Sequence, residues 1–280
     1  MRWREIPIGL SVVTYPLFEP VSRAEAKWHA RMDQSDEDHL IDGYIAAARR
    51  QLEKDTGYTP VNTVYDLTIE RFPQERWIPF PRRPLASVAS VTSYDENDVS
   101  TVMSSGDYRV DTALHRLCLN DDATWPSDLR NFSAGVIRFT AGGNATAATV
   151  SSLTSAGTIP EITATATTSS AHGYSTGDRV TIAGALEGAY NGTFTIRVTS
   201  TTVFTYRIVS GTPAANATGT ITARLLRLPD GYWLAMLMLI EHFARNRGAV
   251  ERVAAGESVA ELPLSYWALS GGADRLYAMA

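Results

Sequence analysis

The stretch that decides the fold is TFTIRVTSTTVFTYRI, residues 193–208 of the chain. Apolar side chains alternate with threonine or arginine in both of its halves, residues 193–198 and 203–208. Since the side chains of a β-strand point in turn to opposite faces of a sheet, this period of two predicts two β-strands. Threonine suits them because its branched Cβ packs well on a pleated surface.

The same composition extends through residues 143–223. These 81 residues hold twenty threonines and only six charged residues, and they contain no Trp, Lys, Met or Cys. The other 199 residues carry 49 charges and all six tryptophans. Glycines punctuate the short strand-like runs, at Gly173, Gly177, Gly184, Gly188, Gly192 and Gly211. This spacing predicts a small all-β sandwich or barrel, inserted as a module into a different domain.

The residues before the module begin with two predicted helices. Ser22 and Glu25 have the spacing of a capping box, which opens a short helix that ends near Arg31. Three acids at residues 36–38 open a second helix, where the helix dipole favours negative charge. Its apolar residues recur at helical spacing as far as Lys54.

Residues 61–140 change to the pattern of strands. Tyr65, Leu67 and Ile69 alternate with polar residues, and the prolines in residues 77–81 predict an edge strand. Residues 95–98 (DEND) predict a hairpin turn.

After the module, Pro229 precedes an apolar helix over residues 232–245. The predicted class is therefore α+β: a small helical core with an antiparallel β region, plus the inserted all-β sandwich or barrel. The predicted domains are residues 1–142 (arm, two helices and β region), 143–223 (the module) and 224–280 (apolar helix and tail).

Composition excludes several classes of protein. The chain has 280 residues, a net charge of −5 and one cysteine, Cys118, which allows neither an internal disulfide nor a thiolate zinc cluster. An acidic total argues against a protein whose main task is to hold nucleic-acid phosphates. The most apolar run, residues 233–240, is too short to span a membrane. Pro7 and Gly9 interrupt the apolar N-terminal run, which predicts an extended arm instead of a signal peptide.

No catalytic or metal-binding motif is recognisable. The turn at residues 95–98 lacks the glycine and the closing glutamate of a calcium loop, and the acids at residues 36–38 suit a helix start. Glu241 and His242 are adjacent on a helix and point about 100° apart, so an acid–base pair is not expected. Cys118 lies in an apolar run typical of a core strand. We therefore expect no enzyme, cofactor or metal.

The basic residues are unusual, because 23 of the 25 are arginine. The planar guanidinium suits interface ion pairs better than the lysine ammonium does, and six Trp and twelve Tyr fit a protein that makes many contacts. Codon bias of a GC-rich genome explains the same excess. Both explanations stay open.

Outside the module, ordered pieces of the chain resemble the head-to-tail connector (head-completion adaptor) proteins of tailed bacteriophages. They cover most of residues 22–142 and 228–265. The pieces are SRAEAKWHARMD (22–33), DEDHL (36–40), IAAAR (45–49), PLASV (84–88), DYRVD (107–111), WP (125–126), LP (228–229), HFARNR (242–247) and ELPL (261–264). The module is the departure from this family, and it is similar to a β module of virion proteins in HGY (172–174), GD (177–178) and YNGTF (190–194).

The resemblance implies a structural adaptor in the virion neck, assembled in the host cytoplasm. Residues 1–142 and 224–280 would be the connector core. Copies would form a homo-oligomeric ring, commonly a dodecamer, below the portal protein, and would present a platform to tail, stopper or nozzle proteins. Genomic DNA would pass through the lumen during packaging and ejection without sequence-specific binding. We expect no membrane partner. The alternative is a virion surface protein that binds carbohydrate or a receptor through the module.

Candidate contact residues for the portal or for the ring lie near the C-terminus. They are Tyr266, Trp267, Leu269, Tyr277, Arg245 and Arg247. Aromatic and arginine side chains dominate the binding energy of many protein interfaces. The aromatic residues would serve equally well to pack within their own subunit.

Overall fold

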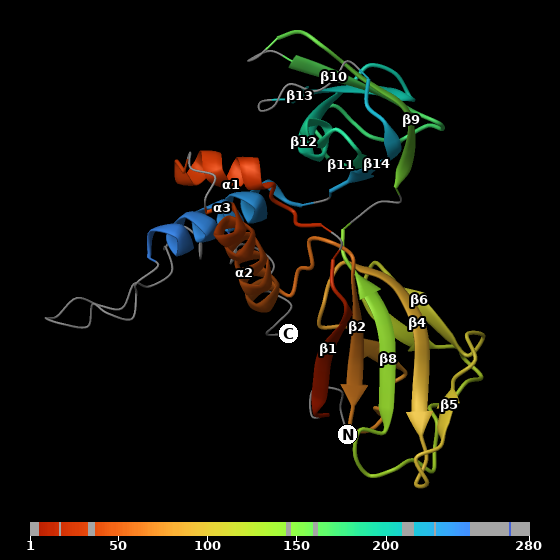
Figure 1. Cartoon of the computed structure of the whole chain (residues 1–280). Coiled ribbons are helices and arrows are strands. Elements are labelled where there is room, and N and C mark those ends of the chain that lie inside the picture. Colours follow the sequence, from red (N-terminus) through yellow and green to blue (C-terminus); the bar gives the residue numbers. More distant parts are fainter. Residues whose placement is uncertain are drawn as a thin grey trace, which may run out of the picture. The chain divides into compact units, whose positions relative to one another are not determined.

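The chain divides into two compact units, shown in Figure 1. The structure, a computed structural model, describes residues 6–16, 18–32, 37–143, 147–158, 162–208, 216–226, 228–246 and Leu269. The strand unit comprises Met1–Phe18 and Gly57–Gly143, and the barrel unit comprises Glu19–Thr56 and Asn144–Ala280. The predicted division at residues 143 and 223 stays a prediction.

The strand unit is built from two antiparallel sheets. The first has the order β1-β2-β8-β4-β5, and the second has the order β3-β7-β6. The strands of the first sheet are β1 (Ile8–Thr14), β2 (Thr63–Ile69), β8 (Gly135–Ala141), β4 (Leu85–Tyr94) and β5 (Ser100–Val102). Those of the second are β3 (Trp77–Pro79), β7 (Arg116–Leu119) and β6 (Tyr108–Asp111).

Strand β2 shows why these residues form a sheet. Tyr65, Leu67 and Ile69 are buried in one hydrophobic cluster with residues of β8, as their alternation predicts. On the other face Asp66 receives two hydrogen bonds from the Arg138 guanidinium, each 2.8 Å long. Alternation therefore sets which face of β2 is buried.

Two further features of this unit agree with the sequence prediction. Strand β3 lies at the edge of its sheet, where the missing N–H of Pro79 costs no ladder hydrogen bond. Residues 95–98 form the turn between β4 and β5, and Asp95 Oδ1 accepts hydrogen bonds of 2.8 Å from the N–H groups of Asn97 and Val99. The hairpin prediction is confirmed.

The all-β module is a closed six-stranded barrel. Its strand order is β10-β13-β12-β11-β14-β9, and β9 pairs with β10 to close it. The strands are β9 (Ala148–Ala156), β10 (Ile162–Thr168), β11 (Arg179–Ala185), β12 (Gly192–Val198), β13 (Val203–Ile208) and β14 (Gly219–Leu225), with a short 3-10 helix, η2 (Gly188–Tyr190). The stretch 193–208 forms the β12–β13 hairpin, and β14 continues past residue 223.

Aromatic side chains fill the barrel. Tyr190, Phe204 and Tyr206 are buried, and the Tyr206 hydroxyl donates a 3.1 Å hydrogen bond to the Tyr190 carbonyl. Burial raises the pKa of Tyr206 far above its ordinary value. The interior is a packed core, as expected for a small barrel.

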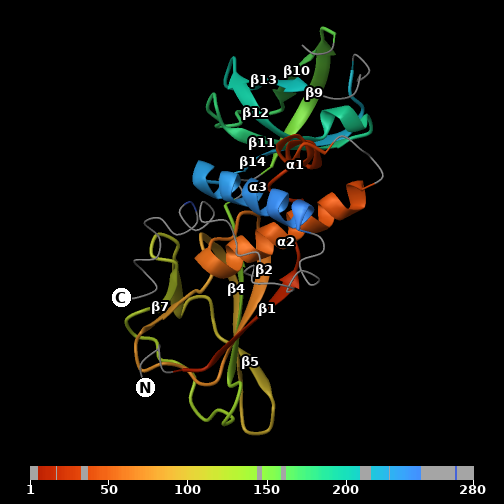
Figure 2. The same ribbon diagram turned by 90° about the vertical axis from the view of Figure 1, so that its left-hand side faces the viewer.

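The helices described in the barrel unit are α1 (Arg23–Ala30), α2 (Asp38–Thr56) and α3 (Asp230–Arg245). Helices α2 and α3 lie in contact, as Figure 2 shows. Buried α2 residues recur at helical spacing, at Ile41, Ile45, Ala48 and Leu52. The prediction of an α+β fold holds broadly, but the helical core fits only loosely. Large hydrophobic clusters lie within the strands instead, because more of the described residues lie in strands than in helices.

Gly142 offers a test of the strand unit. Its φ is +148°, and an added Cβ would lie 2.5 Å from the backbone N of Asn62. We expect Gly142→Ala to lower the free energy of unfolding by more than about 1 kcal/mol, because backbone atoms must move. Chemical denaturation measures the change. Gly106→Ala is the matched control, since its Cβ would meet nothing closer than 3.5 Å. Equal stability of the two variants would contradict the prediction.

Candidate assembly interface

Of the six predicted contact residues, only Arg245 and Leu269 are described. Arg245 ends α3, and its guanidinium lies 2.7 Å from the Glu241 carboxylate, with 65% of the side chain exposed. Leu269 is half-buried, and its carbonyl oxygen lies 3.5 Å from where a Cβ on Gly231 would stand. Tyr266, Trp267, Tyr277 and Arg247 lie outside the described residues, so their role stays a prediction.

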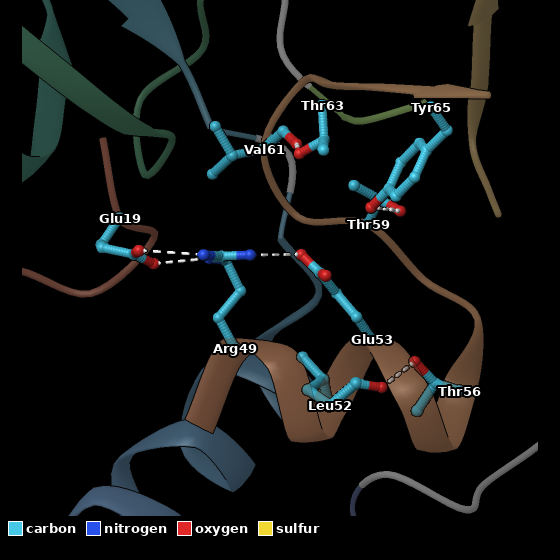
Figure 3. Close-up of polar contacts among 9 residues, drawn as sticks. All are labelled: Glu19, Arg49, Leu52, Glu53, Thr56, Thr59, Val61, Thr63 and Tyr65. Carbon is cyan, nitrogen blue, oxygen red and sulfur yellow. Dashed lines mark hydrogen bonds and ion pairs between the residues drawn. The ribbon is translucent and has the colours of Figure 1, made fainter. Parts of the chain in front are cut away.

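A buried arginine joins helix α2 to the segment before α1, and Figure 3 shows it between two carboxylates. Arg49 on α2 donates to both oxygens of Glu19, at 2.7 and 3.1 Å, and to Glu53 at 3.0 Å. Only 5% of its side chain is exposed. Burial pulls the pKa of Arg49 down, but the hydrogen bonds and charges of Glu19 and Glu53 outweigh it, so that pKa is raised.

Helix α1 is fixed at its start and along one side. The predicted capping box is present: Ser22 Oγ accepts from the Glu25 N–H, and the Glu25 carboxylate accepts from the Ser22 N–H. Arg23 pairs with Asp38 and Asp42 of α2, and Lys27 Nζ lies 2.7 Å from Asp38 Oδ1. The hydrogen bond from Lys27 is the main cause that lowers the pKa of Asp38.

Helices α1 and α3 meet through a histidine. His29 Nε2 lies 3.3 Å from Glu241 Oε2, and this contact is an ion pair only when the imidazole is protonated. His242 contacts Asn246 on its own helix instead of Glu241.

Arg179 at the start of β11 connects the barrel to the helices. Its guanidinium lies 2.6 Å from Glu25 of α1 and 4.5 Å over the ring of Trp233 of α3. The cation and the aromatic face attract each other, and more strongly out of water. No sequence pattern predicts this contact, because its three residues lie far apart in the chain and share no motif.

Strand β1 carries the most unusual surface of the strand unit. All seven of its residues are exposed. Ile8, Leu10 and Val12 stand opposite Ile69, Leu67 and Tyr65, so they lie on the face of the sheet that forms the core. We call them the β1 stripe; they are 46%, 36% and 39% exposed.

The outer edge of β1 is also unpaired within the described chain. Strand β1 is the last strand of its sheet, and no other strand of the described residues pairs with its outer side (Figure 1). An apolar stripe along an open backbone edge invites another chain to bind. The sequence predicted an extended arm here, but not that its apolar face is left uncovered.

The described residues show no arrangement for metal chemistry. No group of three or more His, Cys, Asp or Glu within them could hold a metal ion. Cys118 of β7 is a free cysteine and is half-buried, since the buried residues of this strand are its neighbours Leu117 and Leu119. Among the helices described, none has the length and apolar character needed to cross a membrane.

No protein-family model matches the chain, and no curated protein matches it. Several solved structures match the chain. A chain in the neck of an empty GTA particle, computed with C6 symmetry, is 15% identical with a TM-score of 0.49, over 94% of this chain and 93% of its own. A chain in the virion of a native gene transfer agent (GTA) particle is 24% identical with a TM-score of 0.40, over 48% and 71%.

A third chain comes from the neck of a native GTA particle, computed with C12 symmetry. It is 23% identical with a TM-score of 0.40, over 48% of this chain and 69% of its own. These three are similarities of fold.

We expect Arg49→Met to lower the free energy of unfolding of the barrel unit by about 3–5 kcal/mol. The substitution leaves Glu19 and Glu53 without their buried cation. Thermal and chemical unfolding of the full chain measure the loss. The matched control is Arg50→Met, since Arg50 is the next residue of α2 and is exposed. An equal effect of both substitutions would show that the Arg49 ion pairs contribute nothing.

The lowered pKa of Asp38 predicts a pH dependence. Its ion pairs stabilise the fold fully above the ordinary aspartate pKa and are lost as the pH falls through the lowered value. We expect Tm to be lower in Asp38→Asn than in the parent chain at neutral pH, and the gap to close below about pH 4. Asp122→Asn, at an exposed residue of the strand unit, is the control. A gap that does not change with pH would contradict the assignment.

Proposed function

We propose that the chain is a structural adaptor of the neck of a tailed, phage-like particle. Copies form a ring below the portal protein, commonly a dodecamer, which joins the capsid to tail, stopper or nozzle proteins. Genomic DNA passes through the lumen without sequence-specific binding. The protein acts by assembly and performs no catalysis. It resides in the virion and is assembled in the host cytoplasm.

The observation that carries the proposal is the β1 stripe. A chain that works alone gains nothing from three apolar side chains on the core face of an open sheet edge, and such edges aggregate unless they are covered. A repeating assembly covers the edge in every copy. The uncovered stripe therefore favours a subunit over a solitary binding protein.

The resemblance to connector proteins supports the same function, and its pieces fall on structural positions. SRAEAKWHARMD spans the capping box and all of α1, and IAAAR ends at the buried Arg49. The capping box starts α1, and Arg49 joins α2 to Glu19, so these pieces carry residues with structural roles. The proposal rests on this resemblance and on the β1 stripe, and not on the fold similarities with TM-scores below 0.5.

Charge is compatible with passage of DNA. The module of residues 143–223 has three acids and three bases, so the net charge of −5 belongs to the rest of the chain. A surface of that sign does not hold phosphates by counterion release, which leaves DNA able to slide.

No observation favours the alternative of carbohydrate or receptor binding through the barrel. Sugars are commonly held on exposed aromatic rings, but the five Phe and Tyr residues of residues 148–225 are buried or half-buried. Tyr174 and Phe204 pack against each other in the core.

The test is electron microscopy of the purified full chain mixed with the portal protein of its particle. We expect rings of the full chain. Leu10→Lys should prevent them, because lysine at an edge strand opposes further strand pairing. Leu114→Lys, at a residue 56% exposed in the turn after β6, should leave them intact. Monomers of the unsubstituted chain on every grid, with and without portal protein, would overturn the proposed function.

A further inference from the structure

The barrel presents one large apolar side chain outward. Leu186 follows β11 and is 80% exposed, although the other large apolar residues described in the barrel are buried or half-buried. Glu187 stands beside it and supplies a negative charge. We call these two residues the Leu186 patch. Their position on a closed barrel, which has no free edge, makes them the barrel's distinctive contact feature.

The turn that carries Leu186 is held in place. The Leu186 N–H donates a 2.9 Å hydrogen bond to the Thr218 carbonyl. The two Glu187 carboxylate oxygens accept from the N–H and the hydroxyl of Thr218, each at 2.7 Å. Asn191 adds two hydrogen bonds to Ala185, of 3.0 and 2.7 Å. The two hydrogen bonds from Thr218 lower the pKa of Glu187, chiefly the one from its N–H, so the carboxylate stays charged. Leu186 is therefore presented on a pre-organised turn.

The helices present a second side chain of the same kind. Trp28 of α1 is 81% exposed, and Ala24 and Arg31 are exposed four residues before and three residues after it. We call these three residues the Trp28 patch. No hydrogen bond or ion pair of the Arg31 side chain occurs within the described residues. The capping box and the ion pairs of α1 hold the patch in place.

The two patches are complementary. One combines a large apolar ring with a positive charge, and the other combines an apolar side chain with a negative charge. Trp and Arg are the residue types most enriched at the energetic centres of interfaces. They do not cover each other within one chain, because Trp28 and Leu186 are each about four-fifths exposed there.

We propose that the Trp28 patch of one copy binds the Leu186 patch of the next copy, with Arg31 facing Glu187. This inference rests on the proposed function, which supplies the repeated copies. Each copy would use its helices toward one neighbour and its barrel toward the other, as a head-to-tail ring requires. The barrel would then bind the neighbouring subunit.

The test uses two variants of the full chain, Trp28→Asp and Leu186→Asp, in sedimentation velocity. We expect each to weaken self-association on the order of 30-fold, the loss typical of a hot-spot residue. A 1:1 mixture should recover one-to-one dimers, because it still contains one intact Trp28 patch and one intact Leu186 patch. The mixture should not form rings. Thermal unfolding of each variant checks that it is folded.

Matched controls are Phe132→Asp and Leu114→Asp, at residues 62% and 56% exposed in the strand unit. They should assemble like the parent chain. Assembly of Trp28→Asp or Leu186→Asp at parent strength, or a mixture that stays monomeric, would overturn this contact and leave the neck ring standing. A parent chain that forms no oligomer, alone or with portal protein, would instead overturn the proposed function and this contact with it.

Discussion

The buried guanidinium of Arg49 is the interaction that ties helix α2 to the segment before α1. It lies between Glu19, before α1, and Glu53, on α2, with 5% of its side chain exposed. Removing a charge from water costs several kcal/mol, and only good geometry with opposite charges offsets that cost. The bidentate contact with Glu19 provides that geometry, because a planar fork fits a carboxylate. The arginine excess of the sequence has a structural use at this position.

Unpaired strand edges determine which part of the chain can bind another chain. The barrel pairs every strand on both sides and so has no edge to offer. The five-stranded sheet stays open, and its last strand keeps an apolar stripe on the core face. Backbone N–H and C=O groups need hydrogen-bond partners. The closed barrel supplies them within itself, whereas the open edge of the five-stranded sheet can take them from another chain.

Local patterns in the sequence predicted much of the fold. Alternation in residues 193–208 predicted the β12–β13 hairpin, and Ser22 with Glu25 predicted the start of α1. Patterns did not predict the contacts that join elements distant in the chain. Arg179 meets Glu25 and Trp233, and no spacing rule connects these three residues. Trp28 lies in one of the pieces that resemble connector proteins, but that resemblance does not predict its exposure. Its exposure depends on which face of α1 is buried.

Local sequence patterns are enough to place the helices and many of the strands, and to show that a neutral, threonine-rich module interrupts a charged chain. Those properties depend on neighbours within a few residues, through side-chain alternation, capping and local charge. The closure of the module into a barrel, the position of β1 at the end of a sheet, and the exposure of Trp28 and Leu186 are evident only in the folded chain. Pairing and exposure depend on chain segments that meet in space, and a linear pattern does not record them.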